Sequence, residues 1–531
     1  MADKSVRGTA DVTDGGNSQV LSRRSILRMS LLGSSALFAG PALAACGTSS
    51  GGSGSTASQN VTIGVVGDMV NFDPYYNGTV DFILLQNLNT FLIDYDDKLK
   101  PQPAALTSWE ISSDHTQVTL KLRPNLKLQT GKTWTADDLV QGFKRAADPA
   151  EGQQLNGPMA IVKDYKATDS STVVLTFNQP VPELLITDLL ESFPAVDSAD
   201  NSSKELASKP ASGGPFQLVS RDPGNDVVIS RWPDYWNAKN VHLEKVTFRI
   251  FDNADAMVGA LQSGALDAAY SLPAKNASQL KNQYAIVKGY PGALVQCLRI
   301  NVNTAPWDNI KLRQAVSRAL DRERIAREVY FGYSVPLYLP WGPDSPANDR
   351  SYAKMNSFDL NAAKQLWQEA GSPAGAEALA DGSDADALQM LQILQQDLKQ
   401  IGFDLKITTV DKATFTKRLL AGDFGILFGA IGNSSKSPSR VDTNSIFRIV
   451  KNPVLKDKVP QEYIDAIKAS ERAVTPDQAK AAYAQLNKVI TEQAFGIPVC
   501  DMPTLTATKK SLTGVTRDVD NRLVLEGAKV S

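Results

Sequence analysis

Histidine and cysteine are scarce in this chain, which has two and three of them among its 531 residues. His115 lies in a polar turn and His242 at the start of a strand, and neither accompanies a Gly-x-Ser-x-Gly, His-Glu-x-x-His or Cys/His metal motif. A phosphate-binding loop is missing as well. We therefore expect no enzyme activity, no cofactor and no metal. A hydrolase with a pair of carboxylates is the enzyme class left open, because Asp and Glu are abundant.

The chain also lacks an excess of charge of one sign and a long hydrophobic run. Its net charge is −2, from 55 basic and 57 acidic residues, and no basic stripe alternates with aromatic residues. This pattern excludes the usual nucleic-acid-binding classes. A membrane-spanning helix needs about 20 mostly apolar residues, whereas the most apolar run, residues 29–45, is interrupted by Ser, Gly and Pro. We expect a soluble body.

That apolar run has the features of an export signal. It follows Ser22-Arg23-Arg24-Ser25-Ile26-Leu27-Arg28, which resembles a twin-arginine signal, and it ends in Leu43-Ala44-Ala45-Cys46, which is typical of lipoprotein processing. We predict that residues 1–45 are removed and that Cys46 is lipidated. The Gly/Ser-rich residues 46–59 would form a flexible tether. The alternatives are the general secretory route and a cytoplasmic protein with a hydrophobic N-terminal helix.

Two cysteines, Cys297 and Cys500, remain once Cys46 is acylated. An even pair in an extracytoplasmic protein is compatible with a disulfide. Cysteine is also among the residue types most often buried as a free thiol. We favour two buried free thiols and keep the disulfide as the alternative.

The length of the chain exceeds what one hydrophobic core usually supports, so we expect two or three domains. Strand patterns dominate up to residues 295–301, and helices then alternate with strands as far as residue 500, which indicates an α/β arrangement. Thr135 with Asp138, and Thr475 with Gln478, have the spacing of capping boxes that begin helices.

Eight short motifs follow one another along the chain. They are Phe72-Asp73-Pro74, Pro103-Ala104-Ala105-Leu106-Thr107-Ser108-Trp109-Glu110, Leu120-Lys121-Leu122-Arg123-Pro124, Thr135-Ala136-Asp137-Asp138, Gly214-Pro215-Phe216, Asp234-Tyr235-Trp236, Ser263-Gly264-Ala265-Leu266-Asp267 and Val316-Ser317-Arg318-Ala319-Leu320-Asp321-Arg322. In these motifs and their order, residues 60–531 resemble the extracytoplasmic solute-binding lipoproteins of ATP-binding-cassette importers. The resemblance is to the dipeptide/oligopeptide-binding type, solute-binding protein family 5.

The resemblance implies an α/β, periplasmic-binding-protein-like fold with two α/β lobes, a hinge and an inserted β-rich domain. Domain I would comprise residues 60–92, 209–298 and 502–531, domain II residues 93–208, and domain III residues 299–501. Ligand would bind between domains I and III. The strands expected at 295–301 and 497–501 would be the hinge crossovers, so Cys297 and Cys500 would lie on them.

The function implied is a receptor that binds a solute, closes around it and delivers it to a membrane permease. Such a protein would be a monomer held by its lipid at the outer face of the cell membrane. A nickel-type receptor is disfavoured because imidazole is the commonest ligand for such metals and only two histidines are present. A signalling or chaperone protein that uses the fold without transport is a further alternative.

Peptide-binding members of the family hold the α-amine of the ligand with an aspartate after the strand that ends near Gly429. This chain has Asn433 at that position, followed by Ser434. A carboxylate facing an ammonium contributes about 1.5–3 kcal/mol, and an amide lacks that charge. We therefore keep a neutral solute such as an oligosaccharide beside a peptide, which is slightly favoured. Asp423 or Asp442 would be the compensating carboxylate.

Other candidate ligand-binding residues follow from loops that face the cleft in the family. Met69, Val70 and Asn71 come after the first strand, and Trp341 lies in a Pro-Trp-Gly-Pro loop. An indole ring there would stack on a sugar or on a peptide side chain. The alternative for Trp341 is a packed structural aromatic.

Overall fold

The computed structural model describes residues 58–76, 81–200, 202–432 and 435–531. Contacts divide the chain into Met1–Thr56 and Ala57–Ser531, and all described residues belong to the second unit, called the body below. The predicted export signal, Cys46 and residues 46–57 of the predicted tether lie outside the described residues. Within the described ranges, no helix is both long and apolar enough to cross a membrane.

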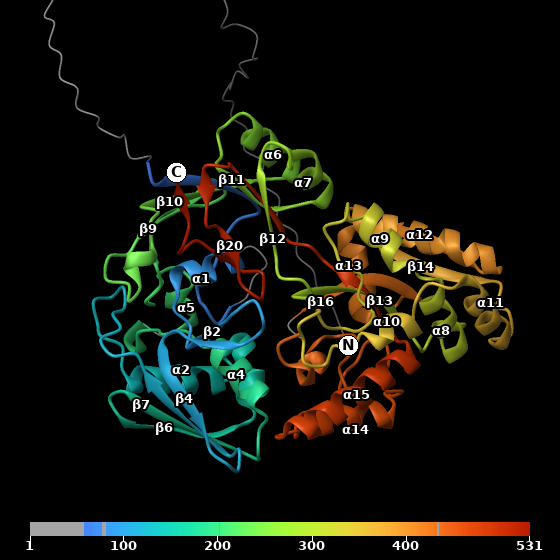
Figure 1. Cartoon of the computed structure of the whole chain (residues 1–531), viewed down its shortest axis with the longest axis horizontal. Helices are drawn as coiled ribbons and strands as arrows, with labels where there is room; N and C mark the ends of the chain where they lie inside the picture. Colours follow the sequence, from blue (N-terminus) through green and yellow to red (C-terminus); the bar gives the residue numbers. More distant parts are fainter. Residues whose placement is uncertain (1–57, 77–80, 201, 433–434) are drawn as a thin grey trace, which may run out of the picture. The chain divides into compact units, whose positions relative to one another are not determined.

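The largest sheet in the described residues has seven strands. In spatial order they are β12 (Ala285–Lys288), β18 (Leu505–Thr508), β11 (Ala268–Leu272), β1 (Asn60–Val66), β10 (Lys245–Phe251), β9 (Asp226–Arg231) and β8 (Phe216–Asp222). Strands β9, β10, β11 and β12 of this sheet are labelled in Figure 1. Strand β1 runs parallel to β10 and β11. Helices α6 (Ala254–Gln262) and α7 (Ala274–Leu280) pack Met257, Leu261 and Leu280 against β11. The sheet is therefore assembled from three distant segments of the chain.

The second sheet is antiparallel and has four strands. In order they are β4 (Leu106–Ile111), β5 (Gln117–Leu122), β7 (Thr172–Phe177) and β6 (Val162–Asp169). Helices α2 (Ala136–Ala147), α3 (Asn156–Met159) and α4 (Glu183–Glu191) contribute to its hydrophobic core. The predicted capping box of α2 is confirmed, because the Asp138 carboxylate accepts the backbone N–H of Thr135 at 2.9 Å.

The third sheet has five strands. In order they are β15 (Asp404–Val410), β14 (Gly375–Asp381), β16 (Ile426–Gly432), β13 (Leu294–Ile300) and β17 (Gly496–Asp501). The helices of this region are α8 (Ile310–Ala319), α9 (Arg322–Glu328), α10 (Ser351–Met355), α11 (Leu360–Glu369), α12 (Ala385–Ile401), α13 (Lys412–Ala421), α14 (Gln461–Ser470) and α15 (Pro476–Gln493). The second predicted capping box is also confirmed, since Thr475 accepts the backbone N–H of Gln478.

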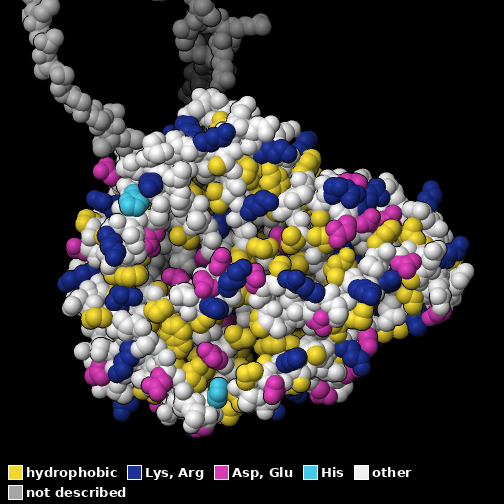
Figure 2. All heavy atoms as spheres, in the orientation of Figure 1, with side chains coloured by type: hydrophobic (Ala, Val, Ile, Leu, Met, Phe, Trp, Pro, Cys, Tyr) yellow, Lys and Arg dark blue, Asp and Glu magenta, His cyan; other side chains and the backbone are white. Residues whose placement is uncertain are grey.

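Short elements complete the body. They are α1 (Leu85–Leu88), α5 (Ser203–Leu206) and the strand pairs β2 (Ile93–Tyr95) with β3 (Pro101–Pro103), β19 (Leu512–Thr513) with β22 (Lys529–Val530), and β20 (Thr516–Arg517) with β21 (Leu523–Val524). On the face shown in Figure 2, basic and acidic side chains are intermingled over the whole surface.

The chain passes between the seven-stranded and the five-stranded sheets twice, over residues 289–293 and 502–504. The two passages lie side by side, because the N–H of Gly289 donates to the carbonyl of Thr504 at 2.8 Å. Strands β13 and β17 pair with each other inside the five-stranded sheet. The chain therefore moves from one sheet to the other directly beside β13 and β17, the strands expected as crossovers. The division into domains I, II and III stays a prediction.

Cys297 on β13 and Cys500 on β17 are buried free thiols. They pack in different hydrophobic clusters, Cys297 with Val295 and Trp341, and Cys500 with Leu298. Burial raises the pKa of each thiol to about 12. The favoured interpretation of two free thiols therefore agrees with the structure, in which the alternative disulfide is not formed.

We expect both thiols to resist alkylation in the native protein, because reaction needs an accessible thiolate. Iodoacetamide treatment at pH 8 without reductant should leave both cysteines unmodified, and the same treatment in denaturant should modify both. Peptide mass mapping measures the two yields. Protection that persists in denaturant until a reductant is added would show a disulfide instead.

Candidate ligand-binding site

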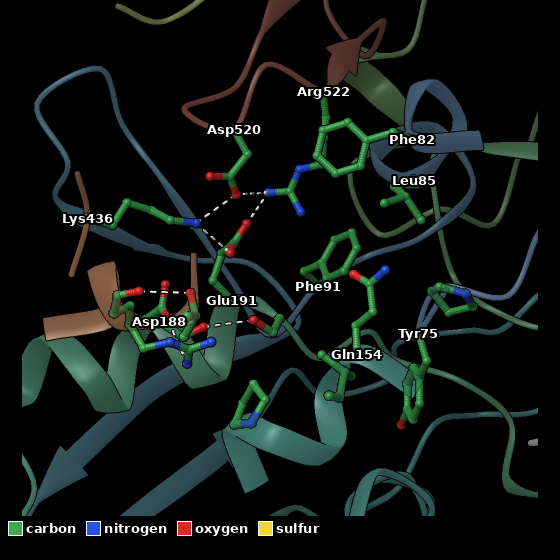
Figure 3. A pocket seen from close by; sticks show the side chains of 16 residues that line it. Tyr75, Phe82, Leu85, Phe91, Gln154, Asp188, Glu191, Lys436, Asp520 and Arg522 are labelled. Carbon is green, nitrogen blue, oxygen red and sulfur yellow. Dashed lines mark hydrogen bonds and ion pairs between the residues drawn. The ribbon is translucent and has the colours of Figure 1, made fainter. Parts of the chain in front are cut away.

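A cavity of about 150 Å³ lies where distant parts of the body meet. Its lining comes from residues 74–75, 82–91, 154–192, 436–443 and 520–522, that is, from segments that the family resemblance assigns to all three domains. Seven of its sixteen lining residues are apolar or aromatic and the other nine are polar, and charged side chains gather at one end (Figure 3). The cavity is therefore amphipathic and is built by tertiary contacts.

Four charged side chains form the ionic cluster of this cavity: Glu191, Lys436, Asp520 and Arg522. The Lys436 ammonium donates to Glu191 at 2.8 Å and to Asp520 at 2.7 Å. The Arg522 guanidinium pairs with Glu191 and lies 3.4 Å from Asp520. Figure 3 shows the two cations pointing toward the two carboxylates. Each side chain is at most 10% exposed, so these charges interact with little screening by water.

Local structure fixes the direction of each charged group. Glu191 is the last residue of α4, one turn after Asp188, so both carboxylates project from one face of the helix. Asp518 accepts the backbone N–H of Asp520 at 3.0 Å and that of Arg522 at 2.8 Å, which holds the turn between β20 and β21. The loop of Lys436 is held by its neighbour Ser435, whose hydroxyl donates to the carbonyl of Gly292 at 2.7 Å.

Aromatic rings lie against the cations of the ionic cluster. The Arg522 guanidinium is 5.0 Å from the ring centre of Phe91 and 6.0 Å from that of Phe82. The Lys436 ammonium is 5.3 Å from the ring of Tyr95. These separations are in the range of cation–π attraction. The rings also exclude water, so the cavity combines charges of both signs with an apolar surface.

The two carboxyl groups of the ionic cluster differ in acidity. Burial opposes ionisation of Glu191, but Arg522 and Lys436 outweigh burial and lower the pKa of this carboxyl. At Asp520 burial dominates and raises the pKa, against the attraction of Lys436. Glu191 therefore carries the negative charge most firmly, and Asp520 is the carboxyl that takes up a proton most readily.

A second ion pair lies at the edge of the cavity, where Arg440 is 3.2 Å from Asp188 of α4. A third pair is buried behind the wall, where Arg145 of α2 pairs with Asp73 and stacks 4.1 Å from the ring of Tyr75. The third pair anchors the segment after β1, which carries Tyr75 into the lining.

Three predicted ligand-binding residues follow β1 but lie outside the lining of this cavity. Met69 is fully buried, and Val70 is 56% exposed. The side chain of Asn71 accepts the backbone N–H of Asp73 at 2.9 Å, as in an Asx turn. Their role in ligand binding stays a prediction, while Pro74 and Tyr75 from the same segment reach the cavity.

Trp341 is fully buried in the hydrophobic cluster beside the five-stranded sheet. Its indole N–H donates to the side-chain oxygen of Asn487 at 3.0 Å, and the Asn487 amide donates to the carbonyl of Ala347 at 2.8 Å. These surroundings are those of the packed aromatic, because no face of the ring is exposed in this structure. Stacking of Trp341 on a ligand has no support in this arrangement.

Gly429 is half-buried on β16, where a Cβ atom would lie 2.8 Å from the Arg299 guanidinium. The guanidinium of Arg299 therefore occupies the space beside Gly429. Asn433 and Ser434 lie outside the described residues. Of the two carboxylates that would compensate for Asn433, Asp423 is exposed and pairs with Arg418 at 3.2 Å, whereas Asp442 lines a neighbouring cavity.

The ionic cluster was missed by the sequence reasoning. A partial signal exists in two places. One is a short turn that contains two carboxylates and a guanidinium, in the segment Asp518-Val519-Asp520-Asn521-Arg522. The other is the helix that ends at Glu191, in which two carboxylates stand among leucine residues. Neither pattern predicts that Glu191 or Asp520 lies next to Lys436.

Residues 100–443 match the family described as bacterial extracellular solute-binding proteins, family 5 middle. The chain belongs to this family. The fold of this family 5 protein is also similar to that of NikA from Brucella suis, solved with Fe(III)-EDTA, with a TM-score of 0.79 and 18% identity over 89% of this chain and 100% of that one. It is similar to a dipeptide binding protein from Pseudoalteromonas sp. SM9913 in complex with Met-Leu, with a TM-score of 0.73 and 19% identity over 89% and 100%.

Among curated proteins, this family 5 protein is similar to the glutathione-binding protein GsiB of Escherichia coli K12. The two are 27% identical over 362 residues, which are 67% of this chain and 70% of the relative. GsiB and the Pseudoalteromonas protein are both named for binding a ligand.

Proposed function

We propose that this protein is the extracytoplasmic receptor of an ABC importer and that it captures a peptide in the cavity around the ionic cluster. The export signal and Cys46 would hold the protein, as a monomer, by a lipid at the outer face of the membrane. A membrane permease would receive the ligand, which is bound without chemical change. The lobes would close about residues 289–293 and 502–504, because ligand contacts with both lobes favour the closed state.

The observation that carries this proposal is the pairing of both charge signs beside aromatic rings inside one cavity. A peptide has an ammonium, a carboxylate and apolar side chains. In this structure the four groups of the ionic cluster pair with one another, so one charged end of a peptide would bind by exchange. Its ammonium would replace a cation at Glu191 or Asp520, or its carboxylate would replace a carboxylate at Lys436 or Arg522, in charge-assisted bonds. A neutral sugar offers only hydroxyls to these groups. The carboxylates of the ionic cluster would thus supply the negative charge that the Asn433 side chain does not carry.

Similar proteins support the same ligand class. One was solved with Met-Leu, and a DppA protein from Helicobacter pylori was solved with the peptide STSA. GsiB is named for binding glutathione, which is itself a peptide. A nickel–histidine complex, with which the similar NikZ from Campylobacter jejuni was solved, finds no imidazole in the described lining of the cavity.

We expect peptides of two to five residues to raise the melting temperature of the mature protein, whereas oligosaccharides leave it unchanged. Ligand at 100 times its Kd stabilises the folded state by about 2.7 kcal/mol. Differential scanning fluorimetry followed by titration calorimetry measures the shift and the Kd. The matched control is the same peptide with an acetylated N-terminus and an amidated C-terminus, which should bind at least tenfold more weakly. A shift with sugars and none with peptides would contradict the proposal.

A further inference from the structure

A second cavity adjoins the first and is larger. It has a volume of about 560 Å³, and Gln154, Pro158, Arg440 and Thr443 line both cavities. Four shared side chains make the two cavities neighbouring compartments of one space. The second compartment lies between the four-stranded-sheet region, residues 154–185, and the segment 440–471.

The first cavity is small for the ligand class proposed above. Its volume of about 150 Å³ equals that of a site that holds a molecule of the size of benzene. One peptide residue with its side chain fills such a volume. The remaining residues of a peptide therefore need further space, and the second cavity provides it without a change in the fold.

The two walls of the second cavity differ in character. One wall is apolar and consists of Pro158, Ile161, Val181 and Leu185. The facing wall is charged and consists of Arg440, Asp442, Arg448 and Glu471. An extended peptide presents apolar side chains on one side and backbone N–H and carbonyl groups along its length. This division fits a peptide that lies lengthwise between the walls.

Burial within the second cavity is considerable even at its charged wall. Desolvation raises the pKa of Asp442, against the attraction of Arg440, and it raises the pKa of Glu471 as well. Water is thus partly excluded from the charged wall, and hydrogen bonds from a peptide backbone to these groups are stronger there than in open solvent.

We propose that the second cavity is a subsite for the distal residues of the ligand, so that this protein is selective for peptides of four or more residues with apolar distal side chains. The proposal rests on the proposed function, since the first cavity must hold one end of the same peptide. Selectivity for length would come from contacts that a dipeptide cannot reach.

Gly157 offers a direct way to block this subsite. It is exposed, it lines the second cavity but not the first, and a Cβ atom added there meets nothing within 4 Å. Gly157→Trp should therefore place an indole at the second cavity without a clash at its Cβ and leave the ionic cluster intact. Gly259→Trp is the matched control, because Gly259 is an exposed helical glycine of α6 with equally open surroundings.

Titration calorimetry with unblocked alanine peptides of two to five residues, each ending in leucine, tests the proposal. The native sequence and Gly259→Trp should bind the pentapeptide at least tenfold more tightly than the dipeptide. Gly157→Trp should lose most of the tenfold gain and weaken dipeptide binding much less, while its melting temperature stays that of the control. Equal affinity of the native protein for both lengths, or an unchanged gain in Gly157→Trp, would overturn the subsite. Failure of every peptide to bind would overturn the proposed function itself.

Discussion

Replacement of Arg522 by methionine should lower the free energy of unfolding by about 3–5 kcal/mol, the cost of removing one partner from a buried ion pair. The Arg522 guanidinium contacts Glu191, Asp518 and Asp520. Without it, Lys436 remains in contact with Glu191 and Asp520, and among the described residues no other cation pairs with these two carboxylates. Urea denaturation at pH 7.5, followed by tryptophan fluorescence, measures the change.

Arg327→Met is the matched control for this change. Arg327 is 65% exposed and pairs with Glu328 at 3.2 Å, so its replacement should change the stability by about 1 kcal/mol or less. Addition of Glu191→Gln to Arg522→Met should recover part of the loss, because one carboxylate no longer needs a partner. Equal urea midpoints for the two single variants would show that the ionic cluster does not stabilise the body.

Asp94→Asn should make the protein more stable at pH 8 than the native sequence, with the advantage disappearing toward pH 4. Asp94 lies on β2, and burial raises its pKa to about 7, against the attraction of Arg522 and with repulsion from Glu191. The folded protein therefore keeps this proton up to about pH 7, whereas the unfolded chain releases it near 3.8.

Between these two values the folded state binds more protons, so the native stability falls as the pH rises. The asparagine variant has no such loss. The advantage at pH 8 has an upper limit of about 4 kcal/mol, since each pKa unit corresponds to about 1.4 kcal/mol. Urea denaturation from pH 4 to pH 8 measures it, with the exposed neighbour change Asp97→Asn as control. If the difference in free energy of unfolding between Asp94→Asn and the native protein does not vary with pH, the raised pKa of Asp94 is contradicted.

Local sequence patterns predicted individual helices well where the helix had one buried face. The capping residues Thr135 and Thr475 lie at the starts of α2 and α15, as their spacing from Asp138 and Gln478 predicts. Such signals act within one turn of the chain. They therefore persist in any fold that contains the helix.

Helix α4 was missed for a related reason. Its polar residues Glu183, Thr187, Asp188 and Glu191 recur at helical spacing, but every residue from Leu185 to Glu191 is buried. A periodic pattern assigns the polar face of a helix to solvent, whereas in α4 that face lies inside the protein. The same burial desolvates Asp188 and Glu191, so the element that the pattern concealed is also the one that brings carboxylates to the cavity.

The amino-acid sequence by itself determined the family, through ordered motifs, and the starts of the capped helices α2 and α15, because capping is a local property. Only the tertiary structure decided the site. Lys436 meets Glu191 across 245 positions of the chain, and Arg522 meets it across 331. Whether a charged residue is solvated or paired in a dry cavity depends on the segments packed around it, and no local pattern of residues contains that information.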